Sequence, residues 1–135
     1  MQFKINNASE RAIYQQIIDQ VKRDIALGRV KTGEKLPTVR ELAAELVINQ
    51  NTISKAYGQL EKDGVIITRP GAGTFVAELS SNLSRTVQKK ILCEMIELML
   101  VEAIHMQIDR KTLVEWFDKL LERFKFGSKD RSKNV

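Results

Sequence analysis

The chain has 135 residues, of which 43% are hydrophobic and 29% charged, a balance typical of a folded globular protein rather than a disordered one. It carries 22 Lys and Arg against 17 Asp and Glu, and the net charge of +5 favours a polyanionic partner such as nucleic acid. One cysteine excludes an internal disulfide, and one Cys with one His is too few for a structural zinc site. The N-terminus lacks the apolar core of a signal peptide and no apolar run is long enough to span a membrane, so we expect a cytoplasmic protein without cofactor or metal.

Two helices are predicted in the first third of the chain. Residues 9–28 repeat apolar side chains every four positions, with Ser9 as the candidate N-cap. Residues 29–36 follow as a connector. A short second helix is predicted over 38–46, because Thr38 and the glutamate three positions later have the capping-box pattern, in which each side chain bonds the other residue's backbone amide. Both helices have one apolar face, so both are expected to pack on a common core.

A third helix and a β-hairpin complete the first half. Asn49 is a strong N-cap candidate, and Gly64 stops the helix that follows it. Residues 65–69 and 74–77 are rich in β-branched and aromatic side chains, and Pro-Gly-Ala-Gly lies between them, which indicates two strands joined by a tight turn. We therefore expect three helices and then a two-stranded hairpin within a first domain of residues 1–78.

The second half is predicted to be helical. After a polar linker at 79–84, a long apolar-rich stretch indicates a helix over 84–106, and a wide apolar stripe indicates a last helix over 110–125. The middle of the first is apolar nearly all round, and two helices alone cannot cover that much apolar surface. We therefore expect the segment 85–127 to pair with a second copy of the chain, and residues 128–135 to form a flexible basic tail. The side chains expected in the dimer are Ile91, Met95, Leu98, Met99, Trp116, Phe117 and Leu120.

Two short helices joined by a tight break, the second with a polar outer face, are typical of a helix-turn-helix, and a following hairpin makes it winged. A helix fits the DNA major groove, which is about 12 Å wide. The helix after Asn49 would turn its N-terminal residues toward base edges, while helix 38–46 braces it against the backbone. At the hairpin, Arg69 supplies charge, and Gly71 and Gly73 let the chain approach DNA closely. The expected fold is mostly α with a small β-hairpin, an N-terminal winged helix-turn-helix followed by a C-terminal two-helix dimerisation segment.

An ordered series of motifs runs through more than half of the chain. They are Ile13-Tyr14-x-Gln16-Ile17, Gly28, Gly33-x-x-Leu36-Pro37-Thr38-x-Arg40-x-Leu42-Ala43, Asn49-x-Asn51-Thr52-Ile53-x-x-Ala56-Tyr57-x-x-Leu60-Glu61-x-x-Gly64 and Gly71-x-Gly73-Thr74-Phe75-Val76. The series resembles the GntR family of bacterial transcription regulators, and the short helical C-terminal part resembles the YtrA-like branch of that family. The resemblance implies that Arg40 contacts DNA, that Gln50, Asn51 and Thr52 belong to the reading surface, and that Gly71 belongs to the wing.

Two departures from the family pattern bear on base preference. Gln50 stands where many relatives have Arg, and Ser54 where some have another Arg. Arginine reads guanine bidentately whereas Asn or Gln favours adenine, so the base preference of Arg-bearing relatives does not carry over. The set of residues expected to contact or shape the DNA interface is Thr38, Arg40, Asn49, Gln50, Asn51, Thr52, Ser54, Lys55, Arg69, Gly71 and Gly73.

These patterns lead us to expect a homodimeric repressor that binds double-stranded DNA at a pseudo-palindromic operator near its own operon, with transporter genes among the candidate targets. A low-specificity architectural DNA-binding protein and a helical module that docks another protein stay open as alternatives, as does an unknown small-molecule effector. An enzyme is not expected, because the chain has no catalytic set. Cys93 is expected to be a small buried apolar side chain, and the lone His105 is not expected to bind metal.

Overall fold

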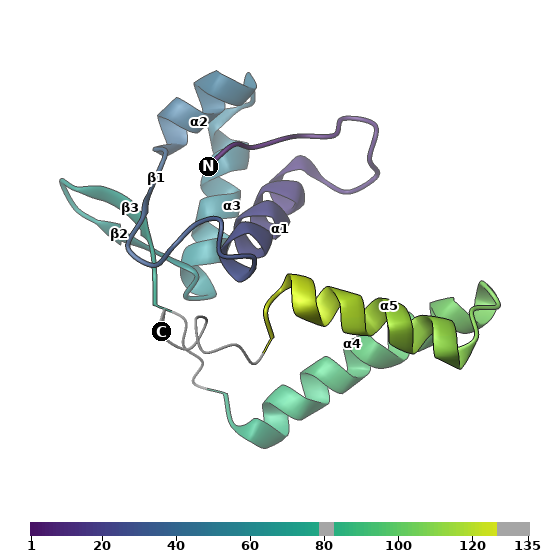
Figure 1. The fold of residues 1–135 in the computed structure, drawn as a ribbon. Helices are drawn as coiled ribbons and strands as arrows, with labels where there is room; N and C mark the ends of the chain where they lie inside the picture. The colour runs from purple at the N-terminus through teal and green to yellow at the C-terminus, as the bar shows by residue number, and fades with distance from the viewer. Residues whose placement is uncertain (79–82, 127–135) are drawn as a thin grey trace. The chain divides into compact units, whose positions relative to one another are not determined.

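The computed structural model describes residues 1–78 and 83–126, which form two compact units (Figure 1). The first unit contains α1 (Ile13–Ala26), β1 (Lys35–Leu36), α2 (Val39–Leu46), α3 (Gln50–Lys62), β2 (Ile66–Arg69) and β3 (Gly73–Val76), and the second contains α4 (Arg85–His105) and α5 (Arg110–Arg123). Most of the predicted linker and the whole predicted basic tail lie outside the described residues. Within the described ranges, no helix is long and apolar enough to cross a membrane.

The core of the first unit forms where α3 contacts α1, α2 and β2. The helices contribute the apolar stripes that their periodicity predicts, each strand adds one apolar side chain, and these side chains are excluded from solvent. The most completely buried are Ile17, Val21, Leu36, Leu42, Ile53, Leu60, Ile66 and Val76. At about 25 cal/mol per Å² of apolar surface, this burial is the main force that holds the three helices and the sheet together.

The helix boundaries follow local capping chemistry in two of the three N-terminal helices. Thr38 Oγ1 accepts a hydrogen bond from the Glu41 amide at 3.0 Å and the Glu41 carboxylate accepts one from the Thr38 amide, which is the predicted capping box. Asn49 caps α3 through a 2.8 Å bond from the Asn51 amide. The prediction of Ser9 as the cap of the first helix is wrong, because α1 begins at Ile13 and has no side-chain cap.

The sheet has three antiparallel strands in the order β1-β3-β2, so the prediction of a simple two-stranded hairpin was incomplete. The turn between β2 and β3 depends on Gly71 and Gly73, whose φ angles of 78° and 125° are unfavourable for side chains with a Cβ. The third strand, β1, lies in the segment predicted as a connector, with Lys35 opposite Phe75 and Leu36 opposite Thr74. Two residues are too few to show the alternation that identifies a strand, so this pairing is visible only in three dimensions.

An N-terminal arm, residues 1–12, packs along α1 and carries a core residue that the sequence pattern did not reveal. Phe3 is 8% exposed and belongs to the core. Two glutamines of α1 hold the arm's backbone: Gln20 accepts from the Lys4 amide at 3.0 Å, and Gln16 accepts from the Asn6 amide at 2.9 Å. The amide group of each glutamine also donates back to an arm carbonyl, so each works as a strand-like partner for the arm.

The second unit is a helical hairpin with exposed apolar faces. The side chain of Ser84 caps α4 by accepting from the Val87 amide, and that of Asp109 caps α5 by accepting from the Thr112 amide. Among residues 83–126 only Ala103 is buried. The prediction that Cys93 is buried is therefore wrong for this chain, in which the thiol is exposed on α4. The physical reason is that α5 is the one element of this unit available to cover α4, and a single helix cannot cover all of its sides.

Candidate nucleic-acid interface

The outward face of α3 is polar and open. Opposite the buried side of the helix, Asn51, Lys55, Gly58 and Lys62 recur at steps of three and four residues, and all are exposed. Gly58 leaves a gap in this stripe because it has no side chain. The space in front of it is open, since a Cβ at this position would meet no atom within 4 Å. A helix with this arrangement presents short and basic side chains toward a major groove while its other side stays in the core.

Two neighbouring elements frame this face. On the hairpin side, the Thr68 amide donates to Glu61 Oε1 at 3.3 Å and ties α3 to β2. On the α1 side, Lys22 Nζ lies 3.4 Å from Asp63 Oδ2. These exposed contacts are individually weak, worth up to about 1 kcal/mol, but together with the buried stripe they fix the orientation of α3 in its unit.

The residues at the start of α2 and α3 are held by capping bonds. The side chains of Thr38 and Asn49 each accept a hydrogen bond from a backbone amide of their own helix. Their first role is therefore to satisfy N–H groups that would otherwise be unpaired at the helix start. Gln50 and Asn51 follow in the first turn of α3 with exposed side chains, and Thr52 is half-buried on the flank. The structure thus brings the predicted reading residues to one end of one helix, where the positive end of the helix dipole also lies.

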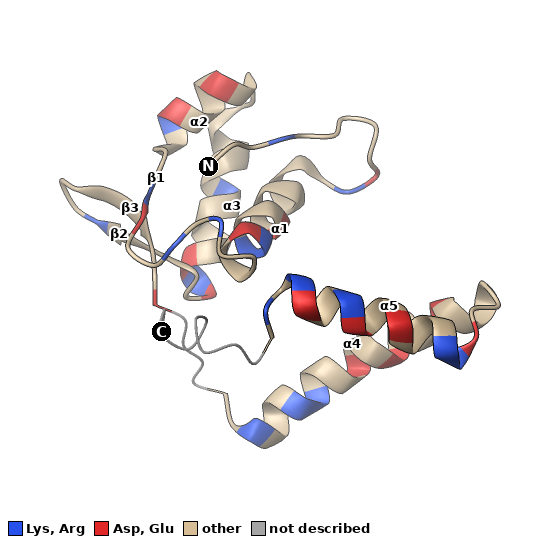
Figure 2. Ribbon diagram, viewed as in Figure 1, with Lys and Arg blue, Asp and Glu red and all other residues tan. Residues whose placement is uncertain are grey.

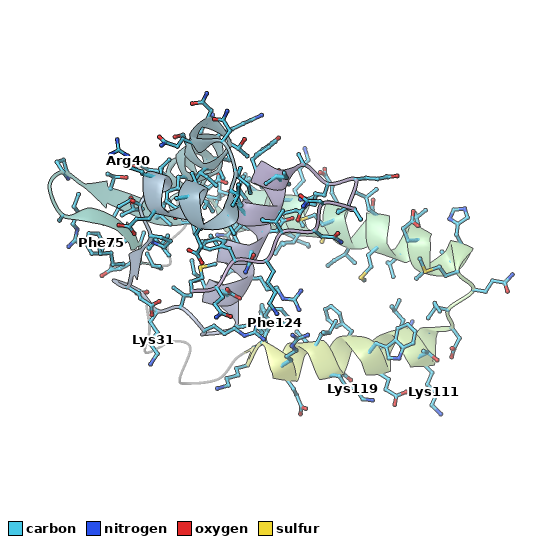
Figure 3. All side chains as sticks on the ribbon, turned by 90° about the horizontal axis from the view of Figure 1, so that it is seen from above. Lys31, Arg40, Phe75, Lys111, Lys119 and Phe124 are labelled. Atoms are coloured by element: carbon cyan, nitrogen blue, oxygen red, sulfur yellow. The ribbon has the colours of Figure 1, made fainter. Side chains whose placement is uncertain are left out.

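Cations from other elements lie around α3. Arg40 stands on the exposed side of α2 (Figure 3). Arg69 ends β2 with its guanidinium carbon 5.3 Å from the centre of the Phe75 ring, so the ring supports the arginine beside the hairpin turn. Figure 2 shows that α2 also contains acidic residues, and the side chain of one of these, Glu41, takes part in the capping box. Ser54 is exposed on α3 toward the same side as Glu61 and β2.

A contact that the sequence motifs did not predict joins α1 to α3. Lys55 Nζ lies 3.9 Å from the centre of the Tyr14 ring. The other tyrosine, Tyr57, is buried, and its hydroxyl donates to the Pro37 carbonyl at 2.8 Å. Burial, reinforced by the negative charge of Glu41, raises the pKa of the Tyr57 hydroxyl above its ordinary value, so it remains a donor that joins α3 to the chain before α2.

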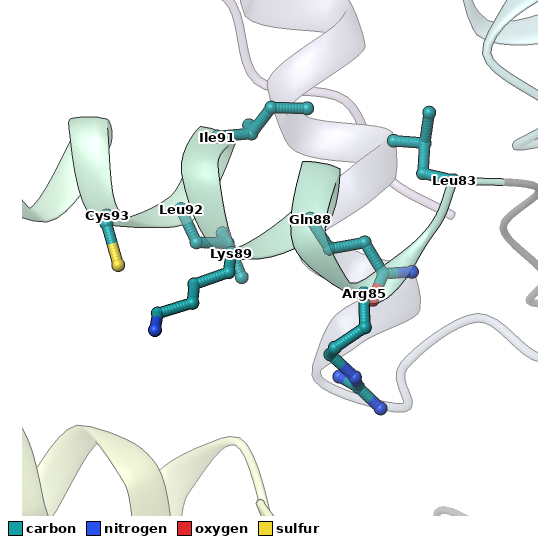
Figure 4. A pocket seen from close by; sticks show the side chains of 7 residues that line it. All are labelled: Leu83, Arg85, Gln88, Lys89, Ile91, Leu92 and Cys93. Atoms are coloured by element: carbon teal, nitrogen blue, oxygen red, sulfur yellow. The ribbon is translucent and has the colours of Figure 1, made fainter.

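The described residues of the second unit form a shallow hollow that is open to solvent. The hollow, of about 510 Å³, runs along the first turns of α4 (Figure 4). It is lined by Leu83, Arg85, Gln88, Lys89, Ile91, Leu92 and Cys93. All of these belong to α4 or the residues just before it, so no second wall encloses a small molecule as in an ordinary pocket. Among the described residues no group of His, Cys, Asp and Glu side chains is arranged to hold a metal ion.

Comparison with known proteins identifies the family. Residues 13–76 match the family of bacterial regulatory proteins called the gntR family. Over 127 residues the chain is 35% identical to the HTH-type transcriptional repressor YtrA of Bacillus subtilis (strain 168), which covers 94% of this chain and 98% of that protein. The chain belongs to the gntR family. It is also 38% identical over 97 residues to the uncharacterized HTH-type transcriptional regulator YhcF of the same organism, over 67% of this chain and 80% of that protein.

Solved structures resemble this gntR-family protein along most of its length. A transcriptional antiterminator from Listeria monocytogenes EGD-e is 30% identical, with a TM-score of 0.79 over 95% of this chain and 96% of that one. The gntR-family transcription factor YtrA from Sulfolobus acidocaldarius is 28% identical, with a TM-score of 0.54 over 93% of this chain and 99% of that one. The predicted family, its YtrA-like branch and the winged helix-turn-helix fold are confirmed. The protein is a DNA-binding transcriptional regulator and not an enzyme.

Proposed function

We propose that this regulator is a sequence-specific repressor that binds, as a homodimer, a pseudo-palindromic operator near its own operon. The observation that carries the proposal is the open polar face of α3, framed by the hairpin on one side and α1 on the other. The repressor YtrA of Bacillus subtilis, which is similar over nearly its whole length, supports the sign of regulation. Occupying a promoter is sufficient to repress it, so the mechanism needs no catalytic group.

The proposed interface assigns different tasks to different residues. Gln50, Asn51 and Ser54 read base edges, because they are exposed in the first two turns of α3. Gln and Asn side chains pair bidentately with adenine, so we expect adenine within each half-site. Arg40 and Lys55 contact the backbone or an adjacent base.

The remaining predicted residues shape the interface. The caps Thr38 and Asn49 orient the starts of their helices, and Thr52 lies on the flank of α3. At the wing, Arg69 supplies charge, while the positive φ angles at Gly71 and Gly73 bend the backbone of the turn. A wing of this kind approaches the DNA backbone or the minor groove beside the site that α3 reads.

The homodimer is proposed to form through the second unit. On α4, Val87, Ile91, Leu98 and Val101 fall on one face at heptad-like spacing, and they are 42%, 44%, 70% and 47% exposed. On α5, Lys111 and Lys119 point away from α4, as Figure 3 shows, while the apolar residues of α5 are also partly exposed. The proposed interface residues Ile91, Met95, Leu98, Met99, Trp116, Phe117 and Leu120 are between 39% and 70% exposed. An apolar surface of this kind marks an interaction site, and a second copy of the same hairpin has the matching surface.

The charges of α4 favour an antiparallel pairing of the two copies. Basic residues occupy its first turns and acidic residues its later turns (Figure 2). The basic residues are Arg85, Lys89 and Lys90, and the acidic ones are Glu94, Glu97 and Glu102. In an antiparallel pair each basic end lies beside the acidic part of the partner, whereas a parallel pair places like charges together, which costs specificity and stability. A two-fold protein then requires a two-fold operator, with half-sites about one helical turn apart or a related spacing.

Selection of bound sequences from random DNA at near-physiological salt tests this function. We expect an inverted repeat to be enriched, because low-specificity electrostatic binding is weakened at that salt concentration. Arg40→Ala should weaken binding to the selected sequence by about 1–3 kcal/mol. Arg23→Ala is the matched control, since it removes an exposed arginine from the last turn of α1. Absence of any enriched repeat, with binding that disappears as salt rises, would refute the proposal in favour of an architectural DNA-binding protein.

A further inference from the structure

The contact between Lys55 and Tyr14 sits at the edge of the proposed reading face. Lys55 belongs to the outward stripe of α3, yet its ammonium lies over a ring that α1 supplies, 3.9 Å from the ring centre. Lys62 lies on the same stripe two turns later. Among the described residues, its ammonium makes no ion pair and no contact with an aromatic ring. The two lysines thus share a helix face but differ in whether a neighbouring element holds the charge.

The ring is a rigid support. Tyr14 is half-buried and packs against the core of the first unit. The turn of α1 that carries it is anchored at its start, where Gln16 Nε2 donates to the Arg11 carbonyl at 2.9 Å. Arg11 in turn forms an ion pair with Asp19 on the next turns of α1. The position of the ring is therefore set before any DNA arrives.

Holding a lysine in place before binding favours the bound state. A free lysine side chain loses rotamer entropy when it is immobilised on a partner. A cation is attracted to the face of an aromatic ring, so the contact with Tyr14 already restricts Lys55 in the free protein. The ring covers one side of the Lys55 ammonium. Of the three N–H donors of the ammonium, at least one remains free to donate to a phosphate oxygen.

We propose that Tyr14 is a positioning residue of the DNA interface, and that its ring presets the Lys55 ammonium for one backbone phosphate on the α1 side of the major groove. The proposal rests on the proposed function, because it takes the outward face of α3 as the face that meets DNA. It extends the interface to α1, outside the helix-turn-helix motif. Since the contact is to phosphate, its contribution is the same for every DNA sequence.

Binding of the full-length protein to the selected operator, measured across a series of salt concentrations, tests the proposal. Lys55→Met should reduce the slope of log K against log salt by about 0.9, because one phosphate contact is lost. Tyr14→Leu should weaken binding about two- to fivefold, which corresponds to the cation–π contribution of about 0.5–1 kcal/mol, and Tyr14→Phe should keep wild-type affinity because it keeps the ring. In the Lys55→Met background, Tyr14→Leu should add no further loss.

Controls separate positioning from folding. Lys62→Met removes a charge from the same stripe without touching Tyr14, so combining it with Tyr14→Leu should give additive losses. If Tyr14→Leu unfolds the first unit, replacing Tyr14 by pentafluorophenylalanine keeps the shape and packing but reverses the quadrupole of the ring, and it should reproduce the two- to fivefold loss.

Two results would overturn the inference. One is wild-type affinity for Tyr14→Leu and for the pentafluorophenylalanine variant, and the other is a loss from Tyr14→Leu of equal size with and without Lys55. The failure of the proposed function looks different: Arg40→Ala and Asn51→Ala would then also bind the operator like the wild type. Weak binding by those two variants, with no effect at Tyr14, would sink the positioning role alone.

Discussion

Val47, in the turn between α2 and α3, adopts a backbone conformation that its side chain disfavours. Its φ and ψ angles are 54° and 52°, in the left-handed region, and its side chain is 89% exposed. The Ile48 amide donates to the Ala43 carbonyl at 3.0 Å and the Val47 amide to the Ala44 carbonyl, the pattern that closes a helix with a left-handed residue. At the corresponding ends of α1 and α3 the left-handed residues are Gly28 and Gly64.

Replacing Val47 with glycine should therefore stabilise the first unit. An L residue in the left-handed region costs about 1–2 kcal/mol, and a β-branched one is especially unfavourable there. Because the valine side chain is almost fully exposed, its removal gives up hardly any burial. The extra backbone entropy of glycine in the unfolded chain offsets about 0.5–1 kcal/mol of the gain. The expected net effect of Val47→Gly is a rise of about 0.5–1 kcal/mol in the free energy of unfolding.

Urea titration of the full-length protein measures this change. Far-UV circular dichroism follows all helices, while the fluorescence of Trp116, the sole tryptophan, reports on α5 in the second unit. The urea midpoint measured by circular dichroism should rise, while the midpoint measured by Trp116 fluorescence should change little. Val47→Ala is the control, because alanine keeps the left-handed penalty of an L residue. If Val47→Gly is no more stable than Val47→Ala, the reasoning from backbone strain is wrong.

Three further predictions concern capping, assembly and pH. Thr38→Ala should lower the free energy of unfolding by about 1 kcal/mol in the same titration, because its capping box is lost, whereas Thr38→Ser should retain it. Leu98→Glu should convert the proposed dimer to a monomer in sedimentation equilibrium, and Lys119→Glu, on the outer side of α5, should not. Partial burial opposes ionisation of Asp19, but hydrogen bonds, chiefly from Arg11, outweigh it and lower the pKa of Asp19. Its stabilising effect should be present above the unfolded pKa of about 3.9 and be lost as pH falls through the folded pKa, so the difference in melting temperature between wild type and Asp19→Asn should shrink in acid.

Local chemistry made much of this protein predictable from its sequence. The capping box at Thr38, the cap at Asn49 and the glycines of the hairpin turn act within a few residues, so each left a readable signal. The same holds for the apolar periodicity of α1, α2, α3 and α5. The motif spacing around these signals was sufficient to indicate the gntR family, which the comparisons confirm.

What depends on distant residues appeared only in the tertiary structure. Strand β1 exists because β3 provides its hydrogen-bonding partner, and Phe3 is buried because α1 holds the arm through Gln16 and Gln20. Neither fact has a local periodicity, since two residues and one aromatic side chain are too short to show one. The prediction that Cys93 is buried was wrong for a related reason. The apolar residues around it in the sequence indicate burial, but burial needs a covering surface, and α5 does not supply enough of one. The sequence alone thus determined which helices form and which protein family their motifs resemble. Long-range packing decided which helix faces are covered, and it placed the Tyr14 ring beneath Lys55.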